Sequence, residues 1–353
     1  MLSIGIDWDD VISDLNARAI ELANREYGFE PPLKLEEITT WENTGRASVI
    51  KQYYKSEELY KAQYVTDEAK KFMEKLRTKG EVYICTAVAP EFMGIRVRQI
   101  KEAFPDFPDE NIIMGFQKSL VHFDVSLDDG AHNILNSNSR YPVLFRKPWN
   151  HEITGILSVN NYDDFLQLLE QIKRSMVEDN YIPEKPAIIA LVGPSGSGKT
   201  ELMYQLLESG NFKKPRSYST NTECSASHVF KPACSFKAED YLETTMYAGH
   251  AYGTKKADID ELMKANKYLV LPLDICGAIT MKRLYPTLIV YCKCSKGTLI
   301  ERILEKSISN EEKKLRLICL DKEMRNANLC DCVIDTENEN AAQVLMEKLS
   351  INY

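Results

Sequence analysis

The sequence has little of what membrane-bound, disordered or fibrous proteins need. Of its 353 residues only 16 are glycine and 14 are proline, and no low-complexity tract interrupts the chain. No apolar run approaches the roughly 20 residues of a membrane-spanning helix. The N-terminus reaches acidic residues already at Asp7, which is too early for the apolar part of a secretion signal. The sequence therefore predicts a folded cytoplasmic protein with no membrane partner.

A surplus of positive charge is also missing. The 44 lysines and arginines are outnumbered by 52 aspartates and glutamates, which gives a formal net charge of -8. Because long stretches of DNA or RNA are held by clustered Lys and Arg, this balance argues against nucleic acid as a partner. Small-molecule nucleotides stay compatible with it, since backbone amides and a bound metal can hold phosphate inside an acidic protein.

The nine cysteines do not follow a metal-binding pattern. The closest pairs, Cys292 with Cys294 and Cys330 with Cys332, have a single residue between them, whereas zinc sites usually have about two to four. We therefore expect buried free thiols.

Length and composition indicate two globular domains. A chain of 353 residues exceeds one ordinary core of about 100 to 200 residues, and its composition, 44% hydrophobic and 27% charged, is that of a folded protein. The stretch VEDNYIPEKP is polar and carries two prolines, so it is the best linker candidate. We predict a first domain over 1–178, a linker over 179–186 and a second domain over 187–353.

Both halves alternate short apolar runs with helical spacing, which is typical of α/β domains. In the first half the predicted strands are 3–6, 82–85, 112–114, 125–127 and 143–145, with a helix over 11–26, a helical insertion over 12–79 and a closing helix over 165–176. In the second half they are 188–192, 268–273 and 287–292, with a helix from Glu201, a polar middle segment over 217–237 and helices around Arg302 and Arg316. No internal repeat is visible.

Polar residues follow several of the predicted strands in the first half. The segment IGIDWDDVI places Asp7 and Asp9 just after an apolar strand, so both carboxylates can reach one site at its carboxyl end. One can attack a phosphoryl group, and the other can give a proton to the leaving oxygen. Later strand ends carry a hydroxyl, a cation and an acidic pair, namely Thr86, Lys118, Asp128 and Asp129. With Mg²⁺, such a set suits phosphoryl transfer, whereas the first segment alone could be a solvated acidic turn.

These residues resemble the haloacid dehalogenase (HAD) superfamily and, within it, the 5'(3')-deoxyribonucleotidase family, over about residues 1 to 175. The D-x-D-x-V loop, the CTA turn at Thr86, the lysine in FQKSLVHFDVSLDDGAHNI and the later FRKPWN segment come in family order. The resemblance implies a HAD-like Rossmannoid domain with a helical cap, Asp7 as the nucleophile that becomes an aspartyl phosphate, and Asp9 as general acid and base. The residue roles that it further implies are phosphate ligands at Thr86 and Lys118 and magnesium ligands at Asp7, Asp9, Asp128 and Asp129.

Asp10 departs from the family pattern, because close relatives usually carry glycine there. Its carboxylate adds negative charge beside the predicted metal site. Trp8 and Trp41 could stack on a base, although an aromatic residue near a cap is more often part of the core.

The string GPSGSGKT, residues 193–200, follows a predicted strand and precedes a predicted helix. In that context glycines let backbone amides face phosphates, Lys199 reaches the outer phosphate oxygens, and the Thr200 hydroxyl binds Mg²⁺. The sequence thus predicts a P-loop that takes ATP as phosphoryl donor. The predicted nucleotide-binding residues are Gly193, Ser195, Gly196, Ser197, Gly198, Lys199 and Thr200.

Residues 186 to 350 resemble guanylate kinases. YLETTMYAGHAYGT looks like the acceptor-site segment of that family, and LPLDICGA looks like the strand that follows it. Arg302 and Arg316 fall where lid arginines stabilise the transferring phosphoryl group. The acceptor-binding residues that the resemblance implies are Ser217, Glu243, Tyr252, Thr254 and Asp274.

The departures from guanylate kinases concern the acceptor. Asn221 and Cys224 stand where two phosphate-binding arginines are expected. His228 takes the place of a tyrosine, and Lys306 that of a second lid arginine. ATP as donor is therefore better supported than GMP as acceptor, and we expect a pyrimidine or modified deoxynucleoside monophosphate instead.

The sequence thus predicts a bifunctional nucleotide enzyme, in which a Mg²⁺-dependent nucleoside monophosphate phosphatase is joined to an ATP-dependent nucleoside monophosphate kinase. If both activities used the same monophosphate, they would oppose each other and only consume ATP. We therefore expect the two domains to act on different substrates. Two alternatives stay open. The chain could be a polynucleotide kinase and phosphatase, against which the acidic charge, the helical cap and the YGT and LDICGA segments argue. Alternatively, one domain is catalytically silent and serves as a nucleotide sensor or interaction module.

Overall fold

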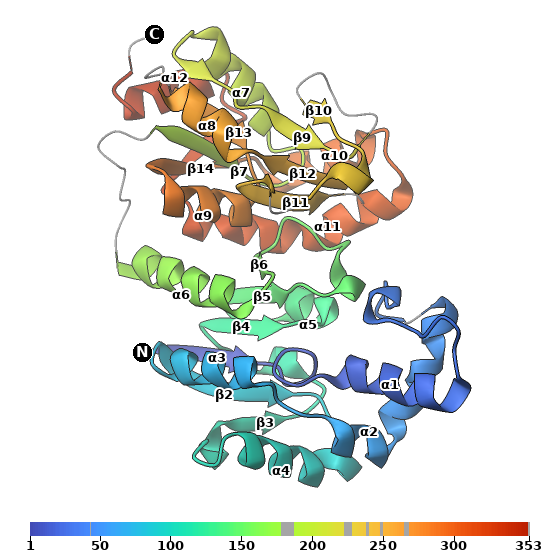
Figure 1. Cartoon of the computed structure of the whole chain (residues 1–353). Coiled ribbons are helices and arrows are strands. Elements are labelled where there is room, and N and C mark those ends of the chain that lie inside the picture. The colour runs from blue at the N-terminus through green and yellow to red at the C-terminus, as the bar shows by residue number, and fades with distance from the viewer. Residues whose placement is uncertain are drawn as a thin grey trace. The chain divides into compact units, whose positions relative to one another are not determined.

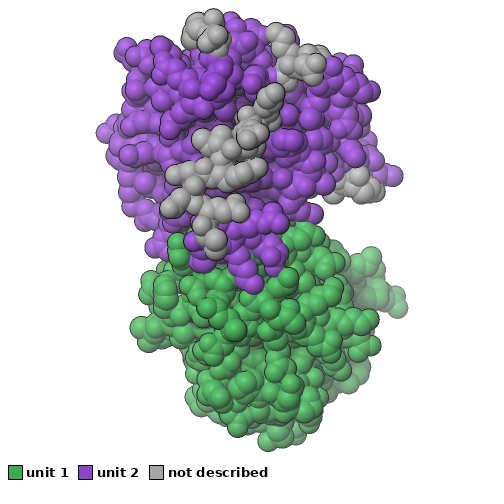
Figure 2. Space-filling view, turned by 90° about the vertical axis from the view of Figure 1, so that its left-hand side faces the viewer, with its two compact units in different colours: residues 1–151, 157–169 green, residues 152–156, 170–353 purple. Residues whose placement is uncertain are grey.

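The computed structural model describes residues 1–42, 44–177, 187–221, 228–237, 240–247, 250–264 and 268–351. The chain forms two compact units, residues 1–151 with 157–169 and residues 152–156 with 170–353, which Figure 2 colours separately. The predicted linker, 179–186, lies outside the described residues, as does Cys224. The predicted α/β class is confirmed, because each unit is built on a parallel sheet with helical connections.

The first unit contains a six-stranded parallel sheet in the order β3-β2-β1-β4-β5-β6 (Figure 1). The strands are β1 Leu2–Ile6, β2 Gly80–Thr86, β3 Ile112–Met114, β4 Val125–Asp128, β5 Tyr141–Phe145 and β6 Ser158–Val159. Their near-continuous apolar runs are those of strands buried on both faces. Strand order reverses at β1 and β4, so the carboxyl ends of these two strands flank the crevice in which such sheets bind ligands.

A largely helical insertion separates β1 from β2. It consists of α1 Leu15–Tyr27, the 3-10 segments Leu35–Glu37 and Gly45–Lys55, and α2 Glu57–Ala62. Its apolar side chains, Ile20, Leu33, Ile38, Ile50 and Leu59 among them, form a buried cluster. The helix α1 begins later than the sequence suggests, because the chain turns at Asp10, whose φ is 57°.

The predicted insertion, 12–79, also contains α3 Asp67–Arg77, which packs elsewhere. Phe72 of α3 stacks on Tyr162 with ring centroids 4.3 Å apart and meets Phe165 edge-on at 6.0 Å. Both partners belong to α6 Tyr162–Val177, so α3 lies with the helices that cover the sheet. The remaining helices of the unit are α4 Met93–Ala103 and α5 Ala131–Asn136.

The second unit combines a five-stranded parallel sheet, in the order β15-β14-β7-β13-β8, with a four-stranded mixed sheet, β10-β9-β12-β11. The strands are β7 Ile188–Val192, β8 Phe212–Lys213, β9 Ser217–Ser219, β10 His228–Phe230, β11 Glu243–Tyr247, β12 His250–Thr254, β13 Tyr268–Pro272, β14 Thr287–Lys293 and β15 Cys332–Asp335. The helices are α7 Lys199–Glu208, α8 Lys256–Met263, α9 Ile275–Leu284, α10 Lys296–Glu305, α11 Asn310–Arg325 and α12 Ala341–Lys348.

The polar segment 217–237 contains β9 and β10, which the sequence pattern did not reveal. Each has only three residues, SYS and HVF, too few to show alternating polarity. All eight cysteines in the described part of the chain are free thiols, and five of them are buried. Across the same residues no helix is both long and apolar enough to cross a bilayer.

Phe72→Ala is expected to lower the free energy of unfolding of the first unit by about 3 to 5 kcal/mol, because the ring is buried and the truncation leaves a cavity. Urea denaturation measures the loss, and native-state hydrogen exchange of the β1 and β2 amides assigns it to the first unit. Val97→Ala, on the exposed side of α4, is the control and should change stability by less than about 0.5 kcal/mol. Equal effects of the two variants would contradict the packing of α3 against α6.

Candidate active sites

Three carboxylates meet where β1 and β4 end. Asp7 directly follows β1, and its backbone N–H donates to the carbonyl of Leu127 at 2.9 Å, which continues the pairing of the two strands. Asp128 ends β4 and Asp129 follows it. One oxygen from each carboxylate lies within 4.8 Å of the others, and all three side chains are buried. Carboxylates at the ends of two different strands thus form one acidic site.

Lys118 bridges two of these carboxylates. Its Nζ lies 2.7 Å from Asp7 Oδ1 and 2.7 Å from Asp128 Oδ2. Burial opposes the charge of the ammonium, but the two carboxylates outweigh it and raise the pKa of Lys118. Burial, followed by repulsion from Asp128, raises the pKa of Asp7 well above its usual range.

The charges of this cluster fit a divalent cation. Three buried carboxylates face a single lysine, so one cation more is needed to balance them. Oxygen ligands of this kind are those that Mg²⁺ prefers. Asp9, which the sequence also predicts as a metal ligand, does not belong to the group of three.

Neighbouring donors fix the acidic pair after β4. Asp128 Oδ1 accepts from the Gly130 N–H at 2.8 Å and from Asn133 Nδ2 at 3.0 Å. Asp129 Oδ2 accepts from the indole N–H of Trp149 at 2.8 Å. Trp149 belongs to the FRKPWN segment, which was noted in the sequence without a role for its tryptophan.

Asp9 is held by two residues that the sequence did not single out. Arg96 NH2 lies 2.7 Å from Asp9 Oδ1 and 2.8 Å from Oδ2, and Gln63 Nε2 donates to Oδ1 at 2.7 Å. Arg96 lies on α4, and Gln63 follows α2 in the insertion. No local pattern distinguishes either residue from an ordinary helical polar residue, so only the tertiary fold reveals them.

Thr86, the last residue of β2, is fully buried. Its hydroxyl has no hydrogen-bond partner among the residues that the structure describes. A buried polar group without a partner is costly, so this hydroxyl is suited to bind an oxygen of a ligand.

The two tryptophans near this site differ. Trp8 is completely buried and packs edge-on against Phe104 at 6.4 Å, so it is a core residue that cannot stack on a base. Trp41 is 51% exposed, and its ring centroid lies 4.6 Å from that of His132.

Asp10, the departure from the family pattern, is buried, and burial raises its pKa to about 8. Its carboxylate accepts from the backbone N–H of Asn16 at 3.0 Å.

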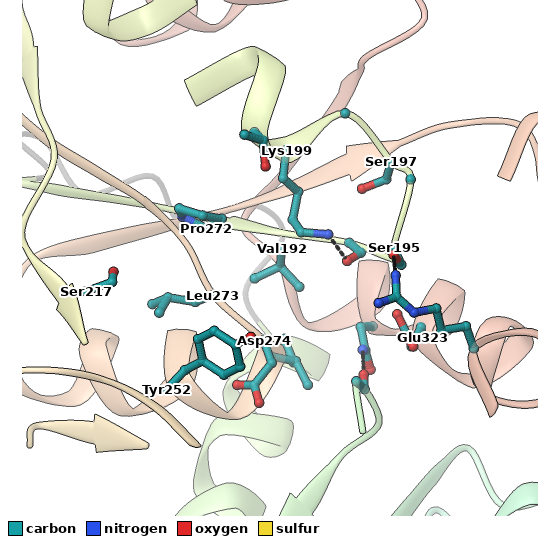
Figure 3. A pocket seen from close by; sticks show the side chains of 18 of the residues that line it. Val192, Ser195, Ser197, Lys199, Ser217, Tyr252, Pro272, Leu273, Asp274 and Glu323 are labelled. Atoms are coloured by element: carbon teal, nitrogen blue, oxygen red, sulfur yellow. Dashed lines mark hydrogen bonds between the residues drawn. The ribbon is translucent and has the colours of Figure 1, made fainter. Parts of the chain in front are cut away.

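The second unit has a cavity of about 660 Å³ around the loop between β7 and α7 (Figure 3). Every residue predicted for this unit lines it. They are Gly193, Ser195, Gly196, Ser197, Gly198, Lys199, Thr200, Ser217, Glu243, Tyr252, Thr254, Asp274, Arg302 and Arg316. The loop needs its glycines, because Gly193, Gly196 and Gly198 have φ values of 153°, 90° and 78°.

Four cations converge on this loop. Lys199 Nζ donates to the carbonyls of Gly193 at 2.5 Å and Pro194 at 2.8 Å. Arg302 donates to the Gly196 carbonyl at 2.8 Å. Two more cations, Lys306 at 2.8 Å and Arg316, donate to the Ser195 hydroxyl. Burial and then repulsion from Arg316 and Lys199 lower the pKa of Lys306 to about 8, which reflects the positive charge gathered at this loop.

Carboxylates line the cavity as well. Asp274 caps α9, accepting from the Gly277 N–H at 2.6 Å. Burial raises the pKa of Glu243, at the start of β11, to about 8, with a smaller contribution from Asp274. Burial also raises the pKa of Glu323 on α11 to about 7, against the opposing charges of Lys199 and Arg316. Glu323 was missed in the sequence, where it is one of many helical glutamates.

Glu243→Gln is expected to stabilise the second unit increasingly as pH rises. The folded Glu243 keeps its proton up to a pKa of about 8, compared with an ordinary value of 4.5. The unfolded chain therefore binds fewer protons between these values, and the free energy of unfolding falls as pH rises through them. Glutamine has no proton to lose, so its advantage should grow from near zero at about pH 4.5 to about 4 kcal/mol at about pH 8.

Native-state hydrogen exchange of the β7 amides, measured across this pH range and corrected for intrinsic exchange, follows the second unit alone. Glu261→Gln, on the exposed side of α8, is the matched control and should show no pH-dependent gain. An advantage of Glu243→Gln that stays constant with pH would contradict a protonated, buried Glu243.

Comparisons with known proteins match the two halves of the chain separately. Residues 1–175 match the family model "5' nucleotidase, deoxy (Pyrimidine), cytosolic type C protein", and residues 185–350 match that of guanylate kinase. A 5'(3')-deoxyribonucleotidase of Bacillus subtilis is 27% identical over 165 residues, which are 46% of this chain and 94% of that protein.

A guanylate kinase of Chlamydia muridarum is 26% identical over 179 residues, 47% of this chain and 87% of that protein. The crystal structure of guanylate kinase from Anaplasma phagocytophilum is 20% identical, with a TM-score of 0.37, and covers 48% of this chain and 87% of its own. This chain therefore joins an N-terminal domain that resembles the 5'(3')-deoxyribonucleotidases of the HAD superfamily to a C-terminal domain that resembles the guanylate kinases.

Proposed function

We propose that the chain is a bifunctional enzyme of nucleotide metabolism, a Mg²⁺-dependent (deoxy)nucleoside monophosphate phosphatase and an ATP-dependent nucleoside monophosphate kinase. The phosphatase rests on the buried cluster of Asp7, Asp128 and Asp129 with Lys118. The kinase rests on the four cations that surround the loop 193–200. Each arrangement places complementary charge where a phosphoryl group and its metal would lie.

In the phosphatase, Asp7 is the nucleophile. A carboxylate oxygen of Asp7 attacks phosphorus, the bond from phosphorus to the ester oxygen breaks, and that oxygen takes a proton from Asp9. Water then attacks the phosphorus of the aspartyl phosphate, gives a proton to Asp9 and restores Asp7. Lys118 and the Thr86 hydroxyl bind the phosphoryl oxygens. Asp7, Asp128 and Asp129 are the residues that would hold Mg²⁺, which would supply further neutralisation of the developing negative charge.

In the kinase, the backbone amides of 193–200 and Lys199 cradle the phosphates of ATP. Lys199 now donates to two carbonyls of its own loop, and it would exchange these for phosphate oxygens. Arg302 and Arg316 reach the same loop from α10 and α11, where their fixed charge stabilises the transferring phosphoryl group. Thr200 is the residue that would hold Mg²⁺.

The acceptor site differs from that of a kinase with arginines for the acceptor phosphate. Among the described residues that line the cavity, the lysines and arginines are Lys199, Arg302, Lys306 and Arg316, and each contacts the loop 193–200. Asn221 has no charge, and Cys224 lies outside the described residues. We propose that Ser217, Glu243, Tyr252, Thr254 and Asp274 bind a pyrimidine or modified deoxynucleoside monophosphate. The two domains then act on different monophosphates, which avoids a cycle that only consumes ATP.

A panel of ribo- and deoxyribonucleoside monophosphates with Mg²⁺, with and without ATP, should reveal phosphate release and diphosphate formation on different members. Asp7→Asn is expected to lower phosphate release by at least about 1,000-fold, because the nucleophile is lost. Lys199→Ala should lower diphosphate formation by at least about 100-fold, because charge on the transferred group is no longer neutralised. Each variant is the control for the other, and chelation of Mg²⁺ should abolish both activities.

Specific outcomes would contradict this function. GMP phosphorylated as efficiently as any other acceptor would disprove the altered acceptor site, and the same preferred monophosphate for both domains would disprove their separation. Activity on the ends of nucleic-acid strands, without activity on monomers, would favour a polynucleotide kinase and phosphatase. Nucleotide binding without turnover in one domain would identify that domain as a sensor.

Gly193→Ala should weaken ATP binding at least about tenfold, which corresponds to about 1.4 kcal/mol. A Cβ there would lie 2.7 Å from Ser197 Oγ and 2.8 Å from the backbone oxygen of Cys292, and the φ of 153° is strained for alanine. The matched control is Gly297→Ala on α10, where the new Cβ meets nothing within 4 Å. Calorimetric titration with Mg-ATP measures both; unchanged affinity in Gly193→Ala would show that the loop does not bind the nucleotide.

A further inference from the structure

We propose that Arg96 and Gln63 are positioning residues of the phosphatase site, which together fix the Asp9 carboxylate in the orientation needed for proton transfer. This inference rests on the proposed function of Asp9 as general acid and base. It concerns two residues that do not belong to the nucleophile, the phosphate ligands or the acidic cluster.

Arg96 is an unusual residue on α4 because it is fully buried. Its NH2 group makes a two-pronged contact to both oxygens of Asp9, at 2.7 and 2.8 Å. Its Nε and NH1 atoms have no hydrogen-bond partner in the described part of the chain. The guanidinium instead lies 5.7 Å from the ring centroids of Trp8 and Tyr60. These rings enclose it, so Asp9 is the carboxylate to which this buried charge is bound.

Gln63 completes the arrangement from the insertion. Its amide nitrogen donates to Asp9 Oδ1 at 2.7 Å and to Ser13 Oγ at 2.8 Å, so both of its N–H bonds are used. The opposite orientation of the amide would place its oxygen against the carboxylate, which accepts hydrogen bonds only. Gln63 is itself buried at the C-terminal end of α2, which restricts the conformations open to its side chain.

The two contacts make the oxygens of Asp9 unequal. Oδ1 accepts from both Arg96 and Gln63, whereas among the described residues Oδ2 accepts from Arg96 alone. Since a carboxylate oxygen has room for about two hydrogen bonds, Oδ2 keeps the free lone pair. The geometry therefore assigns Oδ2 as the atom that passes the proton to the leaving oxygen and later takes one from water. On this assignment Arg96 and Gln63 do not exchange the proton themselves and act only through Asp9.

A positioning role and a purely structural role predict different dependence on the leaving group. Proton transfer matters for a departing alkoxide but little for a thiolate, because a thiol holds its proton far more weakly. The test therefore compares a deoxynucleoside 5'-monophosphate with its 5'-thio analogue, in which sulfur replaces the bridging oxygen. Both carry the same nucleoside, so binding in the cap is matched. The parameter measured is kcat/KM, which includes departure of the leaving group but not the later attack of water.

For Arg96→Met we expect kcat/KM on the oxygen ester to fall by about 100-fold or more, and on the sulfur ester by less than about threefold. Gln63→Leu should show the same selectivity with a smaller loss, and Arg96→Lys should recover part of the rate on the oxygen ester. The control is Gln99→Leu, also on α4, whose amide donates to the backbone of Tyr60 and not to Asp9; its ratio between the two esters should equal that of the wild type.

The outcomes separate this inference from the function on which it rests. Asp9→Asn must show the selective loss on the oxygen ester; if it does not, the role of Asp9 and this inference both fail. If Asp9→Asn shows the selectivity while Arg96→Met and Gln63→Leu lose both esters equally, the proposed function stands and the positioning role is wrong. Urea midpoints of all variants show whether a uniform loss comes from unfolding, and Gln63→Leu and Arg96→Lys keep the test decisive should Arg96→Met fail to fold.

Discussion

Buried negative charge at the ends of β1 and β4 determines the electrostatics of the site in the first unit. Asp7, Asp128 and Asp129 must lie close together because their strands are neighbours in a parallel sheet, and each is less than a tenth exposed. Burial raises the pKa of Asp7 and of Asp129, and repulsion from neighbouring carboxylates raises both further. Lys118 relieves part of this repulsion. The remaining excess of negative charge favours a divalent cation over a neutral ligand.

In the second unit the excess charge at the site is positive. Lys199, Arg302, Lys306 and Arg316 all contact one short loop, and their repulsion contributes to the lowered pKa of Lys306. Backbone carbonyls and a serine hydroxyl accept their hydrogen bonds, and these are weaker partners than phosphate oxygens. On the proposed function, a bound nucleotide would replace these acceptors with phosphate oxygens, so that binding would leave few buried donors unpaired.

Features defined by adjacent residues could be predicted from the sequence, and features defined by tertiary contacts could not. The strand β7 was predicted with correct bounds, and the loop that follows it was recognised from glycine, lysine and threonine at fixed offsets, although α7 begins at Lys199 and not at the predicted Glu201. Asp7 was singled out in the same way, because the D-x-D-x-V loop consists of adjacent residues. Arg96 and Gln63 stand 87 and 54 residues from Asp9, and nothing nearby in the sequence marks them. The positions of β9 and Trp8 were likewise decided by packing, which propensity does not encode.

On the proposed function, an acceptor site with few arginines affects how two opposing reactions can share one chain. An acceptor monophosphate is bound through its base, its sugar and its phosphate, and the phosphate contributes equally for every nucleotide. A site with fewer cations for that phosphate must draw more of its affinity from the base, where Glu243, Thr254 and Asp274 line the cavity. Buried groups that pair with a base discriminate strongly, because a wrong base leaves them without partners. On the proposed function, the weaker hold on phosphate thus sharpens base selection, and sharp selection is the condition under which a kinase and a phosphatase on one chain do not consume each other's products.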